Sequence, residues 1–429
     1  MSEFWCERAW LSGSCVSGVL VRCVDGLITE VSSGVEPPPG VHRLAGVVFP
    51  GFANVHSHAF HRALRGRTHA DGGTFWTWRD AMYRLSARLD PDSYYRLARL
   101  VYAEMALAGF TCVGEFHYLH HAPGGARYAD PNAMGTALIA AARDVGIRIT
   151  LLDTCYLAGG LDGSGYLPLA EPQLRFGDGD VAGWLARVAD LRPSSGAVIG
   201  KALHSVRAVP ELPSVSGLVH VHLSEQPAEN EACQAFHGCS PTELLASAGL
   251  LRPDVTAVHA THLSDVDISL LGSAGVTACF CPTTEADLAD GIGPARELAD
   301  AGCPIALGTD QHAVVDALAE ARALEHGERL RSGSRGRFTP AELVDCLTRH
   351  HALGWDAGRI AVGARADLVS VRLDSPRTAG ASPDQVVLAA TASDVDTVVV
   401  GGQVVVNEGR HEIGSVGGAL SDVIEELWR

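Results

Sequence analysis

The sequence contains one lysine, Lys201, among 429 residues, so its positive charge comes almost entirely from arginine. Acidic residues outnumber basic ones by 50 to 33, and the formal net charge is −17. An excess of negative charge disfavours nucleic acid and anionic membrane surfaces as partners. We therefore expect neither a nucleic acid nor a membrane as a partner of this chain.

Long apolar runs and paired cysteines are missing as well. No stretch of about 18 apolar residues is present, and the N-terminus lacks the basic start and apolar run of a secretory signal. The 11 cysteines are odd in number and include no CxxC pair. This usage is typical of reduced thiols and predicts a cytoplasmic protein. Cys279 and Cys281 could bind a metal, but packing in a buried strand explains them better.

The middle of the chain alternates between short apolar segments and helical patterns. With 47% hydrophobic and 19% charged residues, the composition is that of a globular protein. Eight β-then-α units predict an α/β fold with a parallel (β/α)₈ barrel over residues 49–359. The expected strands lie near residues 46–56, 110–115, 147–155, 197–204, 217–223, 255–260, 275–280 and 304–309.

Both ends of the chain are rich in β-type residues. Residues 1–48 close with the turn sequence "EPPPG", and residues 360–418 include "RADLVSVRL" and "DVDTVVVGGQVVVNEG". Neither end alone can bury a core, so we expect them to pack together as one small β-sandwich domain. We assign residues 419–429 to a C-terminal helix.

Titratable residues end five of the eight expected strands. Functional groups of a (β/α)₈ barrel lie at the C-terminal ends of its strands. His56 and His58 are two positions apart and therefore point to the same side of their strand. Each strand-end residue alone has an ordinary structural explanation, but together they favour a divalent metal site, zinc before iron or manganese. The other strand-end residues are His204, His220, His222, Glu225, His259, His262 and Asp310.

Such a site predicts hydrolysis. Zn²⁺ lowers the pKa of a bound water to about 7. We expect Glu225, in the loop past the strand of His222, to carry a proton from that water to a leaving nitrogen. We expect His259 to polarise the attacked group and Asp310 to ligate the metal and accept the proton of the water.

Lys201 raises the alternative of a two-metal site, in which a modified lysine bridges the ions. It lies three residues before His204, so the two side chains point to opposite faces of a regular strand. We therefore expect one divalent ion per chain.

The motifs "HSH", "HLSE", "VHATH" and "GTDQH", in this order, resemble the amidohydrolase superfamily and, within it, the mononuclear deaminase branch. The resemblance covers nearly the whole chain and implies a barrel with a split small domain. It implies that the metal ligands are His56, His58, His222 and Asp310. It also implies that Glu225 is the proton shuttle and His259 the polarising residue.

Four further segments are similar to the formimidoylglutamate deiminase family of bacterial histidine degradation: "FWTWRDAMYR", "GEFHYLHH", "HSVRAV" and "TTEADLADGI". The resemblance implies conversion of N-formimidoyl-L-glutamate and water to N-formyl-L-glutamate and ammonia, by a homodimer. Arginine suits the two carboxylates of such a substrate because guanidinium presents paired donors. The implied substrate-binding residues are Arg79, Tyr118, His204, Arg207 and His61. The family more usually has Gln where this chain has His61.

Two alternatives remain open. A guanine- or cytosine-type deaminase on the same scaffold would usually carry "PxSN" on the seventh strand, where this chain has Thr284 and Glu285. A non-catalytic scaffold would usually lack one of the ligands, all of which are retained. We treat His117, His120 and His121 as loop residues because their spacing does not require a metal.

Overall fold

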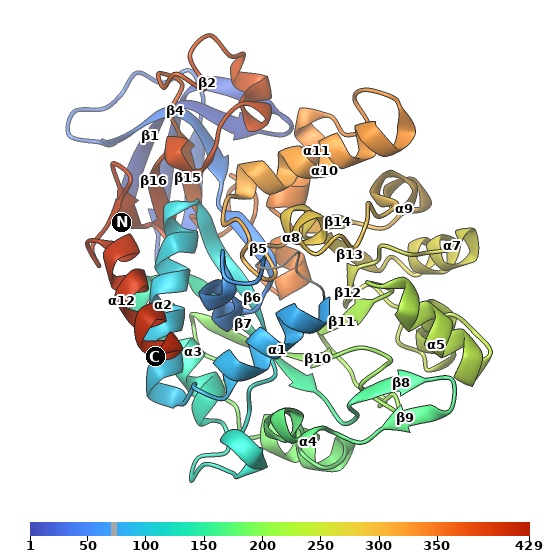
Figure 1. Ribbon diagram of the computed structural model, residues 1–429. Coiled ribbons are helices and arrows are strands. Elements are labelled where there is room, and N and C mark those ends of the chain that lie inside the picture. Colours follow the sequence, from blue (N-terminus) through green and yellow to red (C-terminus); the bar gives the residue numbers. More distant parts are fainter. Residues whose placement is uncertain (70–74) are drawn as a thin grey trace.

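A parallel eight-stranded sheet forms the centre of the molecule (Figure 1). The computed structural model describes residues 1–69 and 75–429. The strand order is β14-β13-β12-β11-β10-β7-β6-β5, which is the chain order of a (β/α)₈ barrel. The strands are β5 (Phe52–Ser57), β6 (Phe110–His117), β7 (Arg148–Cys155), β10 (Ala197–Leu203), β11 (Val219–Leu223), β12 (Val255–His259), β13 (Thr277–Phe280) and β14 (Ile305–Leu307).

The first and last strands of this sheet meet and close the barrel. The amides of Thr309 and Asp310 both donate to the carbonyl of His56, at 3.0 Å each. The amide of His58 donates in turn to the carbonyl of Asp310 at 3.1 Å. The side chain of Asn54 bonds both the amide and the hydroxyl of Thr309. The predicted α/β barrel is therefore confirmed.

Helices surround the barrel and bury apolar faces against it. Their ends follow the usual sequence signals: α2 begins with a capping box between Asp90 and Ser93, and α3 ends at Gly146 in the left-handed conformation. A hairpin of β8 (Gly160–Asp162) and β9 (Gly165–Leu167) follows β7. The helices are α1 (Phe75–Ser86), α2 (Pro91–Leu107), α3 (Ala133–Val145), α4 (Val181–Val188), α5 (Pro227–His237), α6 (Pro241–Ser247), α7 (Asp265–Ser273), α8 (Pro282–Asp287), α9 (Ala295–Ala301), α10 (Ala317–Ser332), α11 (Pro340–Leu347) and α12 (Val416–Trp428).

The two ends of the chain form a second sheet, as predicted. Its order is β18-β17-β16-β15-β4-β1-β2-β3, so C-terminal strands pair with N-terminal ones through β15 and β4. A buried apolar cluster draws residues from both ends, including Phe4, Leu44 and Val399. The strands are β1 (Ser2–Leu11), β2 (Ser14–Val24), β3 (Leu27–Ser32), β4 (His42–Pro50), β15 (Leu368–Val371), β16 (Val395–Val400), β17 (Gln403–Asn407) and β18 (Arg410–His411).

The strand expected at residues 46–56 is in fact two strands. β4 ends at Pro50 in the small sheet, and β5 begins at Phe52 in the barrel. Gly51 lies between them with no room for a side chain, because a Cβ there would come within 2.4 Å of the Thr111 hydroxyl. The expectation of one strand was wrong because Pro50 and Gly51, which interrupt the apolar run, mark the passage from one sheet to the other.

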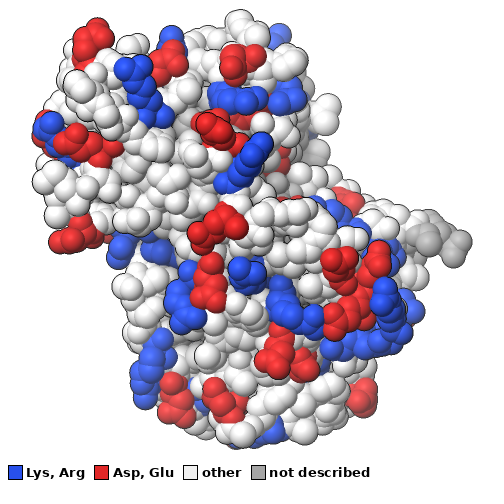
Figure 2. Space-filling view, turned by 90° about the vertical axis from the view of Figure 1, so that its left-hand side faces the viewer, with Lys and Arg blue, Asp and Glu red and all other residues white. Residues whose placement is uncertain are grey.

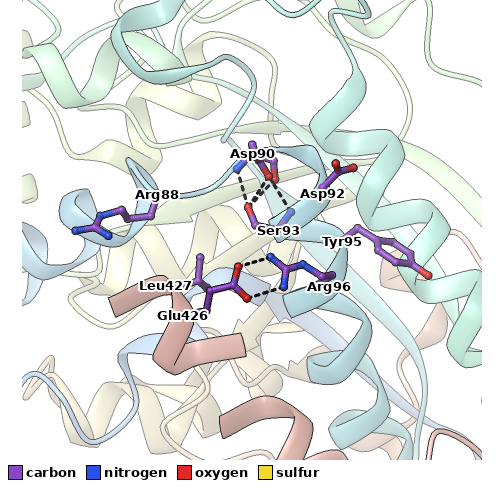
Figure 3. Close-up of a pocket in the computed structure, with 8 residues that line it drawn as sticks. All are labelled: Arg88, Asp90, Asp92, Ser93, Tyr95, Arg96, Glu426 and Leu427. Carbon is purple, nitrogen blue, oxygen red and sulfur yellow. Dashed lines mark hydrogen bonds and ion pairs between the residues drawn. The ribbon is translucent and has the colours of Figure 1, made fainter. Parts of the chain in front are cut away.

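The C-terminal helix starts at Val416, three residues before the expected boundary, and packs along α2. Arg96 of α2 donates two hydrogen bonds to Glu426, at 2.7 and 2.9 Å (Figure 3). An exposed pair of this kind contributes about 1 kcal/mol or less. The indole of Trp428, which donates to the carbonyl of Ala63 at 2.9 Å, adds a more protected contact.

Acidic and basic side chains are interspersed over the face drawn in Figure 2, without an extended area of one sign among the residues shown. Within the part of the chain that the structure describes, no helix is both long and apolar enough to span a membrane.

Candidate metal centre and active site

Four strand-end side chains converge on one point of the barrel. The Nε2 atoms of His56 and His222 are 3.1 Å apart. The Oδ1 atom of Asp310 lies 3.3 Å from Nε2 of His56 and 3.4 Å from Nε2 of His58. Ligands at 2.0–2.1 Å from a tetrahedral zinc ion lie about 3.3–3.4 Å from one another. The spacing of these donor atoms therefore fits binding of a single ion.

Backbone carbonyls orient two of these imidazoles. Nδ1 of His58 lies 2.9 Å from the carbonyl oxygen of Phe116, and Nδ1 of His222 lies 2.9 Å from that of His204. An Nδ1–H that donates to a carbonyl leaves the Nε2 lone pair free for a metal. Burial, with neighbouring imidazoles adding to it, lowers the pKa of His58 to about 3 and that of His222 well below its ordinary value. Both rings are neutral, which is the form that binds metal ions.

Two residues of the centre have strained backbones. His259 has a φ of 69° and Asp310 a φ of 41°, in the left-handed region that side chains other than glycine rarely adopt. His259 ends β12, and Asp310 follows β14. The backbone hydrogen bonds of these short buried segments hold both residues in place. Backbone strain of this kind concentrates at functional sites.

Glu225 and His259 lie beside the ligand cluster. Glu225 follows β11 in a loop, as predicted, and its Oε1 is 3.8 Å from Nε2 of His259. On the other side of the ring, Nδ1 of His259 is 3.4 Å from Oε1 of Glu285. Burial opposes a charge on His259, but the Glu225 carboxylate and then Glu285 outweigh it and raise the pKa to about 10. His259 thus carries a positive charge between two carboxylates.

A cavity of about 470 Å³ opens onto this cluster. Of the metal ligands, His58, His222 and Asp310 reach its surface, and so do Glu225 and His259. All five residues predicted to bind substrate also line it: His61, Arg79, Tyr118, His204 and Arg207. His61 and Tyr118 are within hydrogen-bonding distance, with 3.0 Å between Nε2 and the hydroxyl oxygen. The cavity combines cationic and hydroxyl donors with the cluster of possible metal ligands.

Comparison with known proteins identifies the family. The chain matches the amidohydrolase family over residues 47–191 and 214–405, more than half of its length. The chain belongs to the amidohydrolase family. It is a hydrolase that acts on a carbon–nitrogen bond with a divalent metal, as the strand-end residues predicted.

Relatives of this amidohydrolase include several deaminases. Formimidoylglutamate deiminase of Pseudomonas aeruginosa is 36% identical over 96% of this chain and 96% of its own length. 8-Oxoguanine deaminase of the same species is 32% identical over 83% of this chain and 81% of its own. The crystal structure of an amidohydrolase from Brucella melitensis matches with a TM-score of 0.90 and 32% identity over 100% of both chains. An adenosine deaminase from Xanthomonas campestris with bound zinc matches at a TM-score of 0.82 and 21% identity, over 99% of this chain and 97% of its own, and shares the fold.

Three residues considered in the sequence analysis lie outside the cavity of the amidohydrolase. His220 is buried inside the barrel, with Nε2 2.8 Å from the carbonyl of Ala352. His262 is 2.8 Å from the carbonyl of Asp290. Lys201 donates to the carbonyl of Ser216 at 3.2 Å and is partly exposed, so it does not reach the ligand cluster.

Sequence reasoning missed other residues that line the cavity of the amidohydrolase, among them Tyr156, Gln173 and Glu229. Tyr156 directly follows the end of β7, so the strand-end rule could have found it. Glu229 lies in the first turn of α5, and Glu225 precedes that helix, so no helical spacing relates the two residues. Gln173 belongs to a loop helix far from any strand end, and no local pattern points to it.

His117 and His120 belong to a second buried cluster with Asp153, although the sequence indicated ordinary loop residues. His117 ends β6. One possible metal-ligand atom from each of His117, His120 and Asp153 lies within 4.8 Å of the other two. Arg187 donates to both oxygens of Asp153, at 2.7 and 2.8 Å, and also pairs with Asp178. Because Arg187 already neutralises the carboxylate of Asp153, this cluster is better suited to structural pairing than to holding a cation.

Proposed function

We propose that this amidohydrolase is a formimidoylglutamate deiminase, which hydrolyses N-formimidoyl-L-glutamate to N-formyl-L-glutamate and ammonia. One observation supports the proposal most: Arg79 and Arg207 line the same cavity as Glu225 and the possible metal ligands His58, His222 and Asp310. Two guanidinium groups suit the two carboxylates of this substrate. The Pseudomonas aeruginosa relative, similar over almost the whole chain, supports the choice of substrate.

We propose one Zn²⁺ per chain, held by the cluster of His56, His58, His222 and Asp310. When bound, the ion would make a water acidic enough to attack the amidine carbon at neutral pH. Iron(II) is the alternative metal for the same nitrogen and oxygen donors. The neutral imidazoles described above require no proton loss before they bind either ion.

The remaining residues would handle protons and charge. Each carboxylate would accept one of the two protons of the attacking water: Glu225 would carry its proton to the leaving nitrogen, and the proton held by Asp310 would complete the ammonia. His259, cationic between Glu225 and Glu285, would stabilise negative charge on the attacking oxygen.

The substrate would be oriented by donors on the cavity wall. Arg79 and Arg207 would each hold one carboxylate, and Tyr118 and His204 would add neutral donors. His61, which contacts the Tyr118 hydroxyl, would replace the hydrogen bond of the glutamine more usual in this family.

An ammonia-release assay with quantified metal tests the proposal. N-formimidoyl-L-glutamate, N-formimidoyl-L-aspartate, guanine and cytosine should be compared at equal concentration. We expect rapid release from the glutamate derivative and slower release from the shorter aspartate derivative. The second candidate, a nucleobase deaminase, has support from the 8-oxoguanine deaminase relative. Turnover of guanine or cytosine with an inert formimidoylglutamate would establish that candidate instead.

Other features of the protein stay predictions. We propose a cytoplasmic homodimer, on the strength of the resemblance to formimidoylglutamate deiminases. The division into a small domain of residues 1–48 and 360–418, a barrel of residues 49–359 and a C-terminal helix of residues 419–429 is likewise a prediction.

A further inference from the structure

Glu225 lies between two cations, and each cation has a second carboxylate on its far side. Its Oε2 is 3.5 Å from Nη2 of Arg207, and its Oε1 is 3.8 Å from Nε2 of His259. Behind Arg207, Oε2 of Glu229 is 3.4 Å from Nε. Behind His259, Oε1 of Glu285 is 3.4 Å from Nδ1. The five side chains form a row in which acidic and basic groups alternate, and all of them except Glu285 line the cavity.

Glu229 is the member of this row that the chemistry above does not use. It is 1% exposed, in the first turn of α5, and its carboxylate reaches the cavity wall. Among the described residues, its one ion pair is with Arg207, at 3.4 Å, and burial raises the pKa of the Glu229 carboxyl to about 7 although Arg207 opposes that rise. A buried carboxylate without partners is costly, so this position is stable because of the neighbouring guanidinium.

The guanidinium of Arg207 is shared between the two carboxylates of Glu225 and Glu229. Its Nε faces Glu229 and its Nη2 faces Glu225, and Arg207 itself is partly exposed to the cavity. A guanidinium has five N–H donors, so two carboxylates still leave donors for a ligand. Without Glu229, the nearest carboxylate to Arg207 would be Glu225, and the guanidinium would turn toward it.

We propose that Glu229 is a positioning residue, which holds Arg207 in the orientation that receives a substrate carboxylate and keeps it from closing onto Glu225. This inference rests on the proposed function, in which Arg207 binds one carboxylate of N-formimidoyl-L-glutamate. Glu229 acts through Arg207 and does not itself touch the substrate. It therefore sets selectivity for a carboxylate-bearing amidine.

The variant Glu229→Gln removes the ionisable carboxyl group and keeps the shape. We expect KM for N-formimidoyl-L-glutamate to rise about tenfold, the size of one charge-assisted hydrogen bond, while kcat falls less than about threefold. Glu231→Gln is the matched control, because Glu231 is an exposed residue of the same helix. It should leave both constants unchanged.

A double-mutant cycle with Arg207→Gln decides between positioning and an independent role. If Glu229 acts through Arg207, the double variant is no more impaired in kcat/KM than Arg207→Gln alone. Additive losses would overturn the inference, and so would a Glu229→Gln variant with wild-type constants. Bound metal and thermal unfolding are measured for each variant, and Glu229→Asp takes the place of Glu229→Gln in the cycle if the latter does not fold.

The wild-type enzyme separates this inference from the proposed function. If it does not hydrolyse N-formimidoyl-L-glutamate, the proposed function is wrong, and crystal structures of the wild type and Glu229→Gln decide the role of Glu229. We expect the Arg207 guanidinium to move toward Glu225 in the variant. An unmoved guanidinium refutes the inference.

Discussion

Replacing Asp310 by Asn tests the metal centre directly. Asn keeps the shape of the side chain and, like Asp, tolerates the positive φ of 41° better than Ala does, so added backbone strain is avoided. The change removes the one anionic ligand of the cluster, whose oxygen lies 3.3 and 3.4 Å from two imidazole nitrogens. We expect the affinity for Zn²⁺ to fall by at least about a hundredfold.

The loss of affinity has a calculable effect on stability. At saturating Zn²⁺, a hundredfold change in affinity corresponds to about 2.7 kcal/mol of stabilisation by the bound ion. At about 2.1 cal/mol/K per residue, the entropy of unfolding for a chain of this length is about 0.9 kcal/mol/K, so Tm in excess Zn²⁺ should fall by about 3 °C. Activity should fall with the metal content.

Three measurements check this expectation: elemental analysis after dialysis, thermal unfolding with and without Zn²⁺, and ammonia release. Asp287→Asn is the control, because Asp287 is a nearby carboxylate on α8 that bonds Gln311 and does not line the cavity. A dialysed Asp310→Asn protein with one firmly bound ion and the wild-type rate would refute the metal centre described here.

Further predictions concern the rest of the molecule. Burial raises the pKa of Glu320 to about 8, so the folded protein holds a proton that the unfolded chain releases near its ordinary pKa. Glu320 alone should lower the stability by about 1.4 kcal/mol per pH unit as the pH rises toward 8, and Glu320→Gln should reduce the slope between urea unfolding at pH 5 and pH 8 by that amount. Arg187→Met leaves Asp153 and Asp178 buried without their cation and should cost about 3–5 kcal/mol in urea unfolding, with no loss of bound metal when the folded variant is analysed. A chelator should abolish ammonia release by the wild type, and added Zn²⁺ should restore it; activity that survives complete metal removal would contradict hydrolysis through a divalent ion.

Much of the fold was predictable because each barrel strand is a short apolar run with a marked end. The eight strands lie where the sequence placed them, apart from the run at residues 46–56. Parallel strands covered on both faces have apolar residues throughout, which makes them easy to detect but conceals where one sheet passes into another. Pro50 and Gly51, between Phe49 of the small sheet and Phe52 of the barrel, are the local signal of that passage.

The site was predictable where a residue follows a strand end and not where it approaches from elsewhere. His56, His222 and Asp310 converge because parallel strands of one barrel end on the same side. The pairing of Glu229 with Arg207 depends on how a helix packs over a neighbouring loop, and no spacing along the chain expresses it. The burial of His117 is of the same kind, since α3 covers it from outside the barrel.

The backbone bonds between His56, His58 and Asp310 join the first strand of the barrel to the residue beyond its last strand, about 250 positions later in the chain. An ion bound by the side chains of the same three residues would add a second set of bonds between the first and last strands of the barrel. Loss of the ion and parting of β5 from β14 are then thermodynamically linked events. Amide protons in the hydrogen bonds between β5 and the residues that follow β14 should consequently exchange with solvent faster in the metal-free protein than in the metal-bound protein. The exchange rates of amide protons between β6 and β7 should change least.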